Sequence, residues 1–212
     1  MNDKQKNIMK VRLILAALAA ILALPACQNA GPASDVQSLD EIFASRRSIR
    51  KYDPTKTVSE AEVRTLIAAA LEAPSWANME ATRYYVILEP GKLAEAKQML
   101  GGNLRNVEDA PALIVTTWVK SQSGFFRGQA ANEVGEGWGT YDAGLSNAYF
   151  ILKAREMGMD TLIMGMRDAD ALRALLNIPA EEEVLAVLSL GYRAEDPARP
   201  NRKSVDEIAR FF

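Results

Sequence analysis

The sequence predicts an α+β or α/β fold, in which helices cover a central sheet. Segments with helical periodicity alternate with short apolar strands along the chain, and this order is typical of layered folds. Residues 111–119 are apolar nearly throughout, which indicates a strand buried on both faces. The chain has 212 residues, of which 49% are hydrophobic, so one domain can bury a substantial core.

The expected helices follow from apolar periodicity and from their start and stop signals. Ser59 and Glu62 form a capping box before the second helix, and Pro74 ends that helix. Residues 121–139 are rich in Gly, Ser and Asn, and we expect a loop or short turns there. In full, we expect helices at 39–46, 60–73, 92–100, 141–157 and 168–176, and strands at 84–88, 111–119, 161–164 and 184–190.

The tail from Arg193 onward is polar, basic and interrupted by prolines, so it is a poor candidate for the core. It ends in a short segment that Ser204 and Glu207 can cap as a small helix. We expect the tail to lie across another surface, such as that of a partner subunit.

The N-terminus has the layout of a secretory signal peptide. Basic residues precede an apolar run at 13–24, which is too short to span a bilayer comfortably, and Leu24-Pro25-Ala26-Cys27 follows it. Cys27 is the single cysteine of the chain and stands where a bacterial lipoprotein receives its lipid, although Pro25 is unusual there. The alternative is an ordinary buried cysteine. We expect a signal peptide at 1–26, a flexible tether at 27–38 and one domain at 39–212, in a lipoprotein anchored to a membrane of the cell envelope and facing the periplasm or the exterior.

The composition excludes several kinds of site. The chain contains no histidine, so it has neither Ser-His-Asp nor Cys-His nucleophilic machinery, and we predict no metal site. The net charge of −2 argues against a nucleic-acid partner. An enzyme built from this sequence therefore depends on a cofactor or on carboxylates.

Two segments carry side chains suited to a cofactor. Residues 46–50 read Arg-Arg-Ser-Ile-Arg at an expected helix end, and arginine forks are good donors to phosphate. The alternative is a solvated charged face. Asn78 follows Pro74-Ser75 on a short loop, and its amide can pair with both a donor and an acceptor on a ring. The alternative there is a simple turn residue.

These segments, with the motifs that follow them, resemble the nitroreductase family of FMN-dependent oxidoreductases over roughly residues 40–210. The resemblance rests on the order of the motifs: Arg46 to Arg50, Pro74-Ser75-Trp76-Ala77-Asn78-Met79-Glu80, Asp142-Ala143-Gly144, Met157-Gly158-Met159, Leu162-Ile163-Met164-Gly165, Leu190-Gly191-Tyr192 and Arg202-Lys203. It implies a three-layer α+β fold, with a central mixed, mainly antiparallel sheet flanked by helices and a C-terminal tail that reaches across a homodimer.

The resemblance also implies roles for individual residues. Arg46, Arg47 and Ser48 correspond to the phosphate and ribityl ligands of FMN, and Arg202 or Lys203 closes the phosphate from the tail. Arg50 corresponds to the cation beside the flavin ring, and Asn78 to the amide that pairs with the ring edge. Met164 and Gly165 correspond to the loop whose backbone approaches flavin N5.

The implied reaction is ping-pong hydride transfer from NAD(P)H, through flavin N5, to a small-molecule acceptor such as a nitroaromatic or a quinone. The chemistry takes place at N5, so we predict no catalytic side chain. The acceptor face is predicted to consist of aromatic side chains, for which core or interface packing is the alternative: Trp76, Phe125, Phe126 and Trp138.

Two features depart from the family pattern. Glu80 replaces the usual glutamine and can pair with Arg83, and Ala81-Thr82 replaces the common Pro-Trp. A secreted lipoprotein would also work where nicotinamide cofactors are not expected. The alternatives are therefore an envelope flavoprotein that binds FMN but uses another donor or has no turnover, a structural lipoprotein that has lost FMN, or a different flavin chemistry on the same fold.

Overall fold

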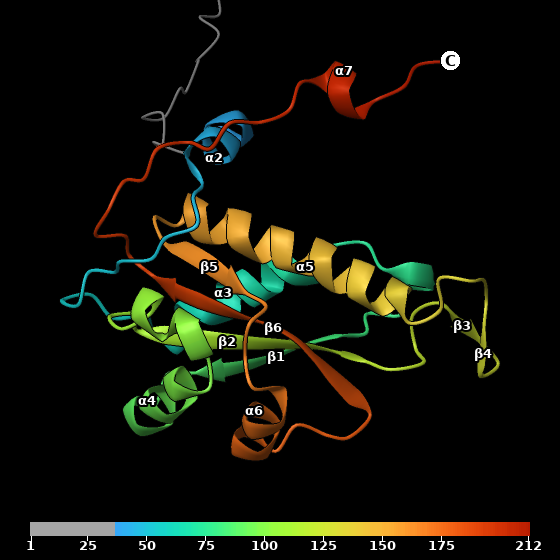
Figure 1. The fold of residues 1–212 in the computed structure, drawn as a ribbon, viewed down its shortest axis with the longest axis horizontal. Helices are drawn as coiled ribbons and strands as arrows, with labels where there is room; N and C mark the ends of the chain where they lie inside the picture. Colours follow the sequence, from blue (N-terminus) through green and yellow to red (C-terminus); the bar gives the residue numbers. More distant parts are fainter. Residues whose placement is uncertain (1–36) are drawn as a thin grey trace, which may run out of the picture. The chain divides into compact units, whose positions relative to one another are not determined.

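A four-stranded antiparallel sheet lies at the centre of the fold (Figure 1). In spatial order its strands are β1 (Thr82–Ile87), β2 (Ala112–Val119), β6 (Glu182–Gly191) and β5 (Asp160–Met164). Its three ladders are antiparallel, and a bridge between Ser48 and Thr161 adds one parallel pairing at the β5 edge. The prediction of a mainly antiparallel sheet is confirmed.

The computed structural model describes residues 37–212. The expected signal peptide, Cys27 and nearly all of the expected tether lie outside these residues. Within the described range, no helix combines the length and the apolar composition that crossing a bilayer requires.

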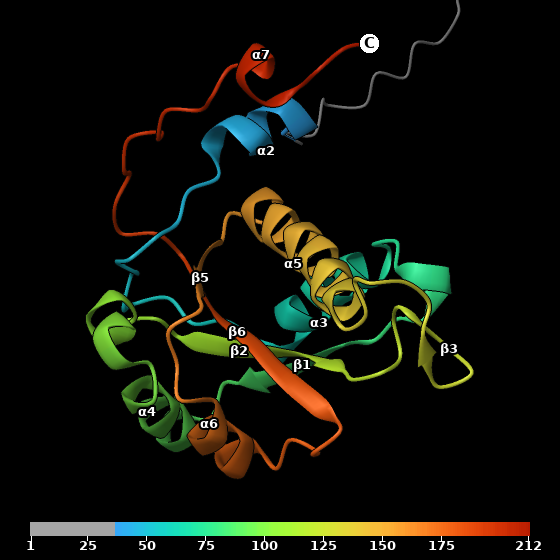
Figure 2. The ribbon, with the colours of Figure 1, turned by 45° about the vertical axis from the view of Figure 1, so that its right-hand side comes forward.

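Helices cover both faces of the sheet and make three layers (Figure 2). The side chains of β2 alternate between the two layers, as the pleat of a strand requires. Ala112 and Ile114 pack in one core with α3 (Glu60–Leu71) and α5 (Gly137–Glu156). Leu113 and Val115 pack in a second core with α4 (Pro90–Gln98) and α6 (Ala169–Leu176). Both faces of β2 are buried, as its apolar composition predicted.

The remaining elements of residues 37–212 are short. They are α2 (Leu39–Ser45), η1 (Trp76–Asn78), η2 (Gly101–Asn106), β3 (Phe125–Phe126), β4 (Gln129–Ala130) and α7 (Val205–Ile208). Capping boxes begin α3 and α7 as predicted, with Ser59 and Ser204 as their N-caps.

The expected loop at 121–139 is partly regular structure. Residues 125–130 form a β-hairpin, and α5 begins at Gly137 rather than at Tyr141. Gly139 misled the sequence prediction because it reads as a helix breaker. A Cβ at this position would lie 2.2 Å from Cδ1 of Trp118, so the glycine allows close packing inside the helix.

The C-terminal tail begins alongside residues 51–53. Arg193 bridges Tyr52, and the Ala194 N–H donates to the Lys51 carbonyl at 3.0 Å. The chain then runs past α2 and away from the sheet (Figure 1). Large apolar side chains of this tail are exposed: Val205, Ile208, Phe211 and Phe212.

Candidate functional site

An apolar groove of about 660 Å³ runs along α5 where this helix faces β5 and β6. Arg46 bounds the groove at the end of α2, and Gly165 bounds it just after β5. Gly144, Ala148 and Ile151 of α5 line it between them. A larger groove of about 1050 Å³ lies between α4 and the 57–58 loop, but it contains none of the predicted site residues. The groove along α5 is therefore the candidate site.

Among residues 37–212, Arg46 is the one charged side chain that lines this groove. Its side chain makes no hydrogen bond or ion pair within residues 37–212, although it is partly buried. Burial lowers the pKa of Arg46, and the nearby positive charges of Arg202 and Arg47 lower it further. An anion placed here would favour the charged form of Arg46 and so oppose this lowering of its pKa, and the cluster is therefore suited to a phosphate.

The rest of the 46–50 segment has mixed roles. Arg47 donates to the carbonyl oxygens of Ala44 at 2.6 Å, Arg46 at 2.8 Å and Pro197 at 3.2 Å, so its side chain fastens the tail to α2. Ser48 is exposed and bridges Thr161 of β5. The exposed Arg50 donates to the Ser48 carbonyl, and Arg202 and Lys203 lie in the exposed tail.

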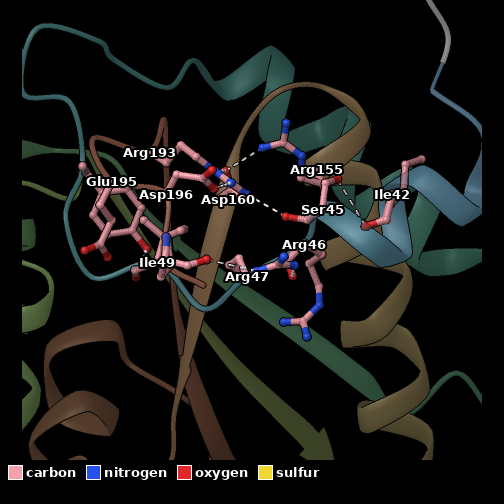
Figure 3. Close-up of polar contacts among 12 residues, drawn as sticks. Ile42, Ser45, Arg46, Arg47, Ile49, Arg155, Asp160, Arg193, Glu195 and Asp196 are labelled. Carbon is pink, nitrogen blue, oxygen red and sulfur yellow. Dashed lines mark hydrogen bonds and ion pairs between the residues drawn. The ribbon is translucent and has the colours of Figure 1, made fainter. Parts of the chain in front are cut away.

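A buried ion cluster lies next to residues 46–50 (Figure 3). The carboxylate of Asp160 has no exposed side-chain surface and accepts from Arg155 at 2.9 Å and from Arg193 at 2.7 Å. Arg193 also donates to the carbonyl of Ser45, the last residue of α2, at 3.0 Å. The cluster therefore joins α5, β5 and the exit of β6 to the residue that precedes Arg46.

The two residues predicted near flavin N5 differ in environment. The Met164 side chain is only 2% exposed and belongs to the core, so its backbone alone can serve a ligand. Gly165 is exposed, and a Cβ added there would meet no atom of residues 37–212 within 4 Å. The same is true of Gly144 across the groove. Packing within the described chain does not explain either glycine, whereas a ligand or partner in the groove would.

Asn78 lies at the other end of α5, in a turn with unusual backbone angles. Ala77, Asn78 and Glu80 all have positive φ, at 47°, 56° and 48°. The N–H of Trp76 donates to the buried carboxylate of Asp142 at 2.9 Å, which fixes the turn to α5. Positive φ in non-glycine residues is costly and is often retained at functional sites.

The expected pairing of Glu80 with Arg83 is wrong. The Glu80 carboxylate accepts from the Asn78 amide at 3.1 Å, and Arg83 donates to the main-chain carbonyl of Glu80 instead. The turn at Glu80 directs its carboxylate back towards Asn78, so the side-chain pair that spacing suggested does not form.

The predicted aromatic residues lie near this turn. The hairpin carries Phe125 and Phe126, and Phe126 is 63% exposed. Gln122, beside the hairpin, donates to the Met79 carbonyl at 3.1 Å and so links it to the turn. Trp138 packs edge-on against Tyr141 at the start of α5. The structure thus gathers Asn78 with the aromatic residues at one end of α5, and Arg46 with the start of the tail at the other.

The distance between the two groups follows from helix geometry. Asp142 holds the turn near the first residues of α5, and Arg155 joins the ion cluster in its last turn. At 1.5 Å per residue, the two positions are about 20 Å apart along the helix. One chain therefore does not bring Asn78 next to Arg46.

Several residues that position these groups escaped the sequence analysis. Asp160 is an isolated acidic residue before a strand, and Arg193 read as part of a solvated basic tail. The one sequence signal for a buried ion pair was the position of Asp160 directly before a strand. Asp142 was noticed within a motif, but its bond to Trp76 was not foreseen.

The family assignment comes from comparison with known proteins. The model of the family described as Nitroreductase family matches residues 43–192. The chain belongs to the nitroreductase family.

Curated relatives cover nearly the same length. Protein DrgA of Synechocystis is 25% identical over an alignment of 191 residues, which covers 80% of this chain and 90% of that protein. An NADH dehydrogenase of Thermus thermophilus is 25% identical over an alignment of 189 residues, which covers 77% of this chain and 90% of that protein. Similar solved structures include the nitroreductase family protein of Streptococcus pneumoniae (TM-score 0.72, 22% identity, 82% of this chain and 100% of that chain). A candidate nitroreductase of Exiguobacterium sibiricum, solved in complex with FMN, has a TM-score of 0.74 and 21% identity over 83% of this chain and 98% of that chain.

Membership of this nitroreductase family confirms the predicted fold, the oxidoreductase class and, at the level of the family, FMN as the cofactor. The roles of individual residues stay predictions, as do the lipid anchor and the acceptor.

Proposed function

We propose that this protein is an FMN-dependent oxidoreductase of the cell envelope, which passes electrons from a nicotinamide donor to a small nitroaromatic, quinone or related acceptor. The observation that carries the proposal is the arginine cluster around Arg46, at the end of an apolar groove. A flavin phosphate has the charge that this cluster lacks, and a flavin ring has the apolar faces that the groove accommodates.

The residues present fit FMN. Arg46 and Arg202 hold the phosphate, and the open surface at Gly144 and Gly165 leaves room for the ring to approach the backbone. Arg47 contributes indirectly, since it fastens the tail that carries Arg202. When bound, FMN supplies hydride transfer, and the protein orients it and keeps water from the groove.

A homodimer completes this proposed site. Asn78 and the aromatic residues lie about 20 Å along α5 from the arginine cluster, so a second copy can supply them across the groove. Exposed apolar side chains flank this face and are suited to such an interface: Phe43, Tyr141, Tyr149 and Ile163. Sedimentation of the flavin-loaded protein should give twice the mass of the chain, and a monomer with full flavin occupancy would contradict this part of the proposal.

The choice of donor can be tested with the flavin itself. Purified protein with bound FMN should lose its visible absorption on anaerobic addition of NADH or NADPH, and recover it with a quinone or nitroaromatic. The name of the Thermus relative supports NADH as the donor. Flavin that bleaches with dithionite but not with either nucleotide would instead support the second candidate, an envelope flavoprotein with a different donor.

The envelope location rests on the leader and on Cys27, which lie outside the described residues. We propose that Cys27 carries the lipid that anchors the protein. The full chain expressed in bacteria should fractionate with membranes, and Cys27→Ser should release it. A wild-type chain found in the soluble fraction with its leader intact would contradict the anchor.

A further inference from the structure

The groups that hold the segment before and after Arg46 form a continuous network around Asp160. On one side, Ser45 accepts from Arg193, which is bound to Asp160. On the other, the Ile49 N–H donates to the Thr161 carbonyl at 3.1 Å, directly after Asp160 in β5. Arg46 itself is not part of this network, so its guanidinium stays available.

We propose that Asp160 and Arg193 are positioning residues for the phosphate site, which place Arg46 and the tail's Arg202 where they can share one anion. The inference rests on the proposed function, because it assumes that this cluster holds the FMN phosphate. Neither residue touches the groove, and both act through the backbone of α2 and of the tail.

The geometry at Asp160 is that of an anchor. Arg193 binds both carboxylate oxygens, with Nε on Oδ2 and a terminal nitrogen on Oδ1, each at 2.7 Å. Such a two-point contact fixes the orientation of the guanidinium as well as its position. The remaining terminal nitrogen of Arg193 binds Asp196 at 2.8 Å, and this second carboxylate is 86% exposed.

The path from Arg193 to Arg202 runs along the tail. Ala194 binds Lys51, the Glu195 carboxylate accepts from the Arg50 N–H at 2.7 Å, and Pro197 accepts from Arg47. These contacts lay the start of the tail against residues 47–51. Fixing Arg193 therefore also fixes where the tail that carries Arg202 leaves the body of the fold.

Charge alone makes a different prediction from positioning. Asp160 is a negative charge near a proposed phosphate, so its removal should favour anion binding if only the local potential matters. If Asp160 orients Arg193 and Ser45, its removal should weaken anion binding. Asn at this position keeps one acceptor oxygen but turns an NH₂ group towards the arginines, which breaks the two-point contact.

The test compares the binding of FMN and riboflavin to the flavin-free protein, by quenching of flavin fluorescence. Riboflavin lacks the phosphate, so the ratio of the two affinities measures the phosphate site rather than general stability. For Asp160→Asn and for Arg193→Lys, which keeps the charge but loses the fork, we expect FMN affinity to fall about tenfold or more, with riboflavin affinity unchanged.

Asp196→Asn is the matched control, because it removes the same charge from the exposed partner of the same arginine. It should leave the ratio within about twofold of the wild-type value, as exposed ion pairs contribute little. If Asp160→Asn fails to fold, Arg193→Lys alone decides the matter.

Three outcomes separate the inference from the proposed function. A wild-type protein that binds FMN no better than riboflavin would overturn the phosphate site, and with it the inference. A wild type that prefers FMN, with variants that keep the preference or bind FMN more tightly, would overturn the positioning roles alone. Parallel loss of both ligands would show a merely structural role and overturn them as well.

Discussion

At the C-terminal end of α5, Asp160 binds two arginines and has no exposed side-chain surface, whereas at the N-terminal end Asp142 accepts a main-chain N–H from Trp76. The first end holds charged side chains in a fixed frame of ion pairs. The second holds a short turn with three positive φ angles beside a hairpin that exposes Phe126. The comparison indicates that ion pairs fix the C-terminal end of α5, where we place the FMN phosphate. A turn and a hairpin form the N-terminal end, where we place the acceptor.

The largest effect is expected when the charge of Arg46 is removed from the C-terminal end of α5. Arg46→Gln should weaken FMN binding roughly 100-fold, because it removes a charge-assisted contact from a partly buried site. Titration of the flavin-free variant measures the change. Arg64→Gln is the control, since Arg64 is exposed and pairs with Glu60 on α3. Equal losses in the two variants would contradict a specific role for Arg46.

Two glycines of α5 can be used to distinguish packing within the chain from packing against a partner or ligand. Gly139→Ala should lower the free energy of unfolding by about 3 kcal/mol, because its Cβ would overlap Trp118. Chemical denaturation of the flavin-free protein measures it. Gly144→Ala, where a Cβ meets nothing within 4 Å, should cause no such loss from contacts within the chain. A loss at Gly144 as large as at Gly139 would show that a partner already covers this position.

The contacts at the N-terminal end of α5 can be weakened without touching the proposed phosphate site. Asp142→Ala leaves the Trp76 N–H without its acceptor and should cost about 2 kcal/mol of stability. The ratio of FMN to riboflavin affinity should stay at the wild-type value. Denaturation and flavin titration on the same variant check both statements, and a changed ratio would mean that the two ends of α5 are not independent.

The fold was predictable where local patterns determine structure. Ser59 and Glu62 predicted the start of α3, and the apolar run at 111–119 predicted the central strand β2. The hairpin and the first turn of α5 were missed, because the packing of Gly139 against Trp118 joins elements that are distant in the sequence. The same limit applies to the site, since nothing local marks Arg193 as the partner of Asp160.

Arg46 and Glu80 show what residue type and spacing can and cannot predict about the site. Arg46 was predicted from its place in a basic segment at a helix end, and the structure puts it on the groove. Its neighbour Arg47 has the same chemistry, but carbonyl oxygens occupy its guanidinium. Glu80 was paired with Arg83 by spacing, and the backbone turn sends its carboxylate to Asn78 instead.

The smallest expected effect lies away from both ends of α5. The Glu62 carboxylate accepts from Ser59 and from Tyr192, and the Ser59 bonds hold the pKa of Glu62 below its ordinary value of 4.5. Its contribution to stability is therefore full above pH 4.5 and is lost as the pH falls through the lowered pKa. Glu62→Gln should be less stable than wild type at neutral pH, and the difference should shrink in acid, as measured by denaturation at several pH values. A difference that grows in acid would contradict the stabilising role assigned to the Glu62 carboxylate. The affinities for FMN and for riboflavin should not change.

The most direct test of the account is a crystal structure of the protein with FMN. The account predicts the phosphate between Arg46 and Arg202, at the C-terminal end of α5, with the Asn78 turn of a second copy facing the same flavin. A phosphate bound elsewhere, such as at the turn of residues 76–80 or in the groove beside α4, would contradict it.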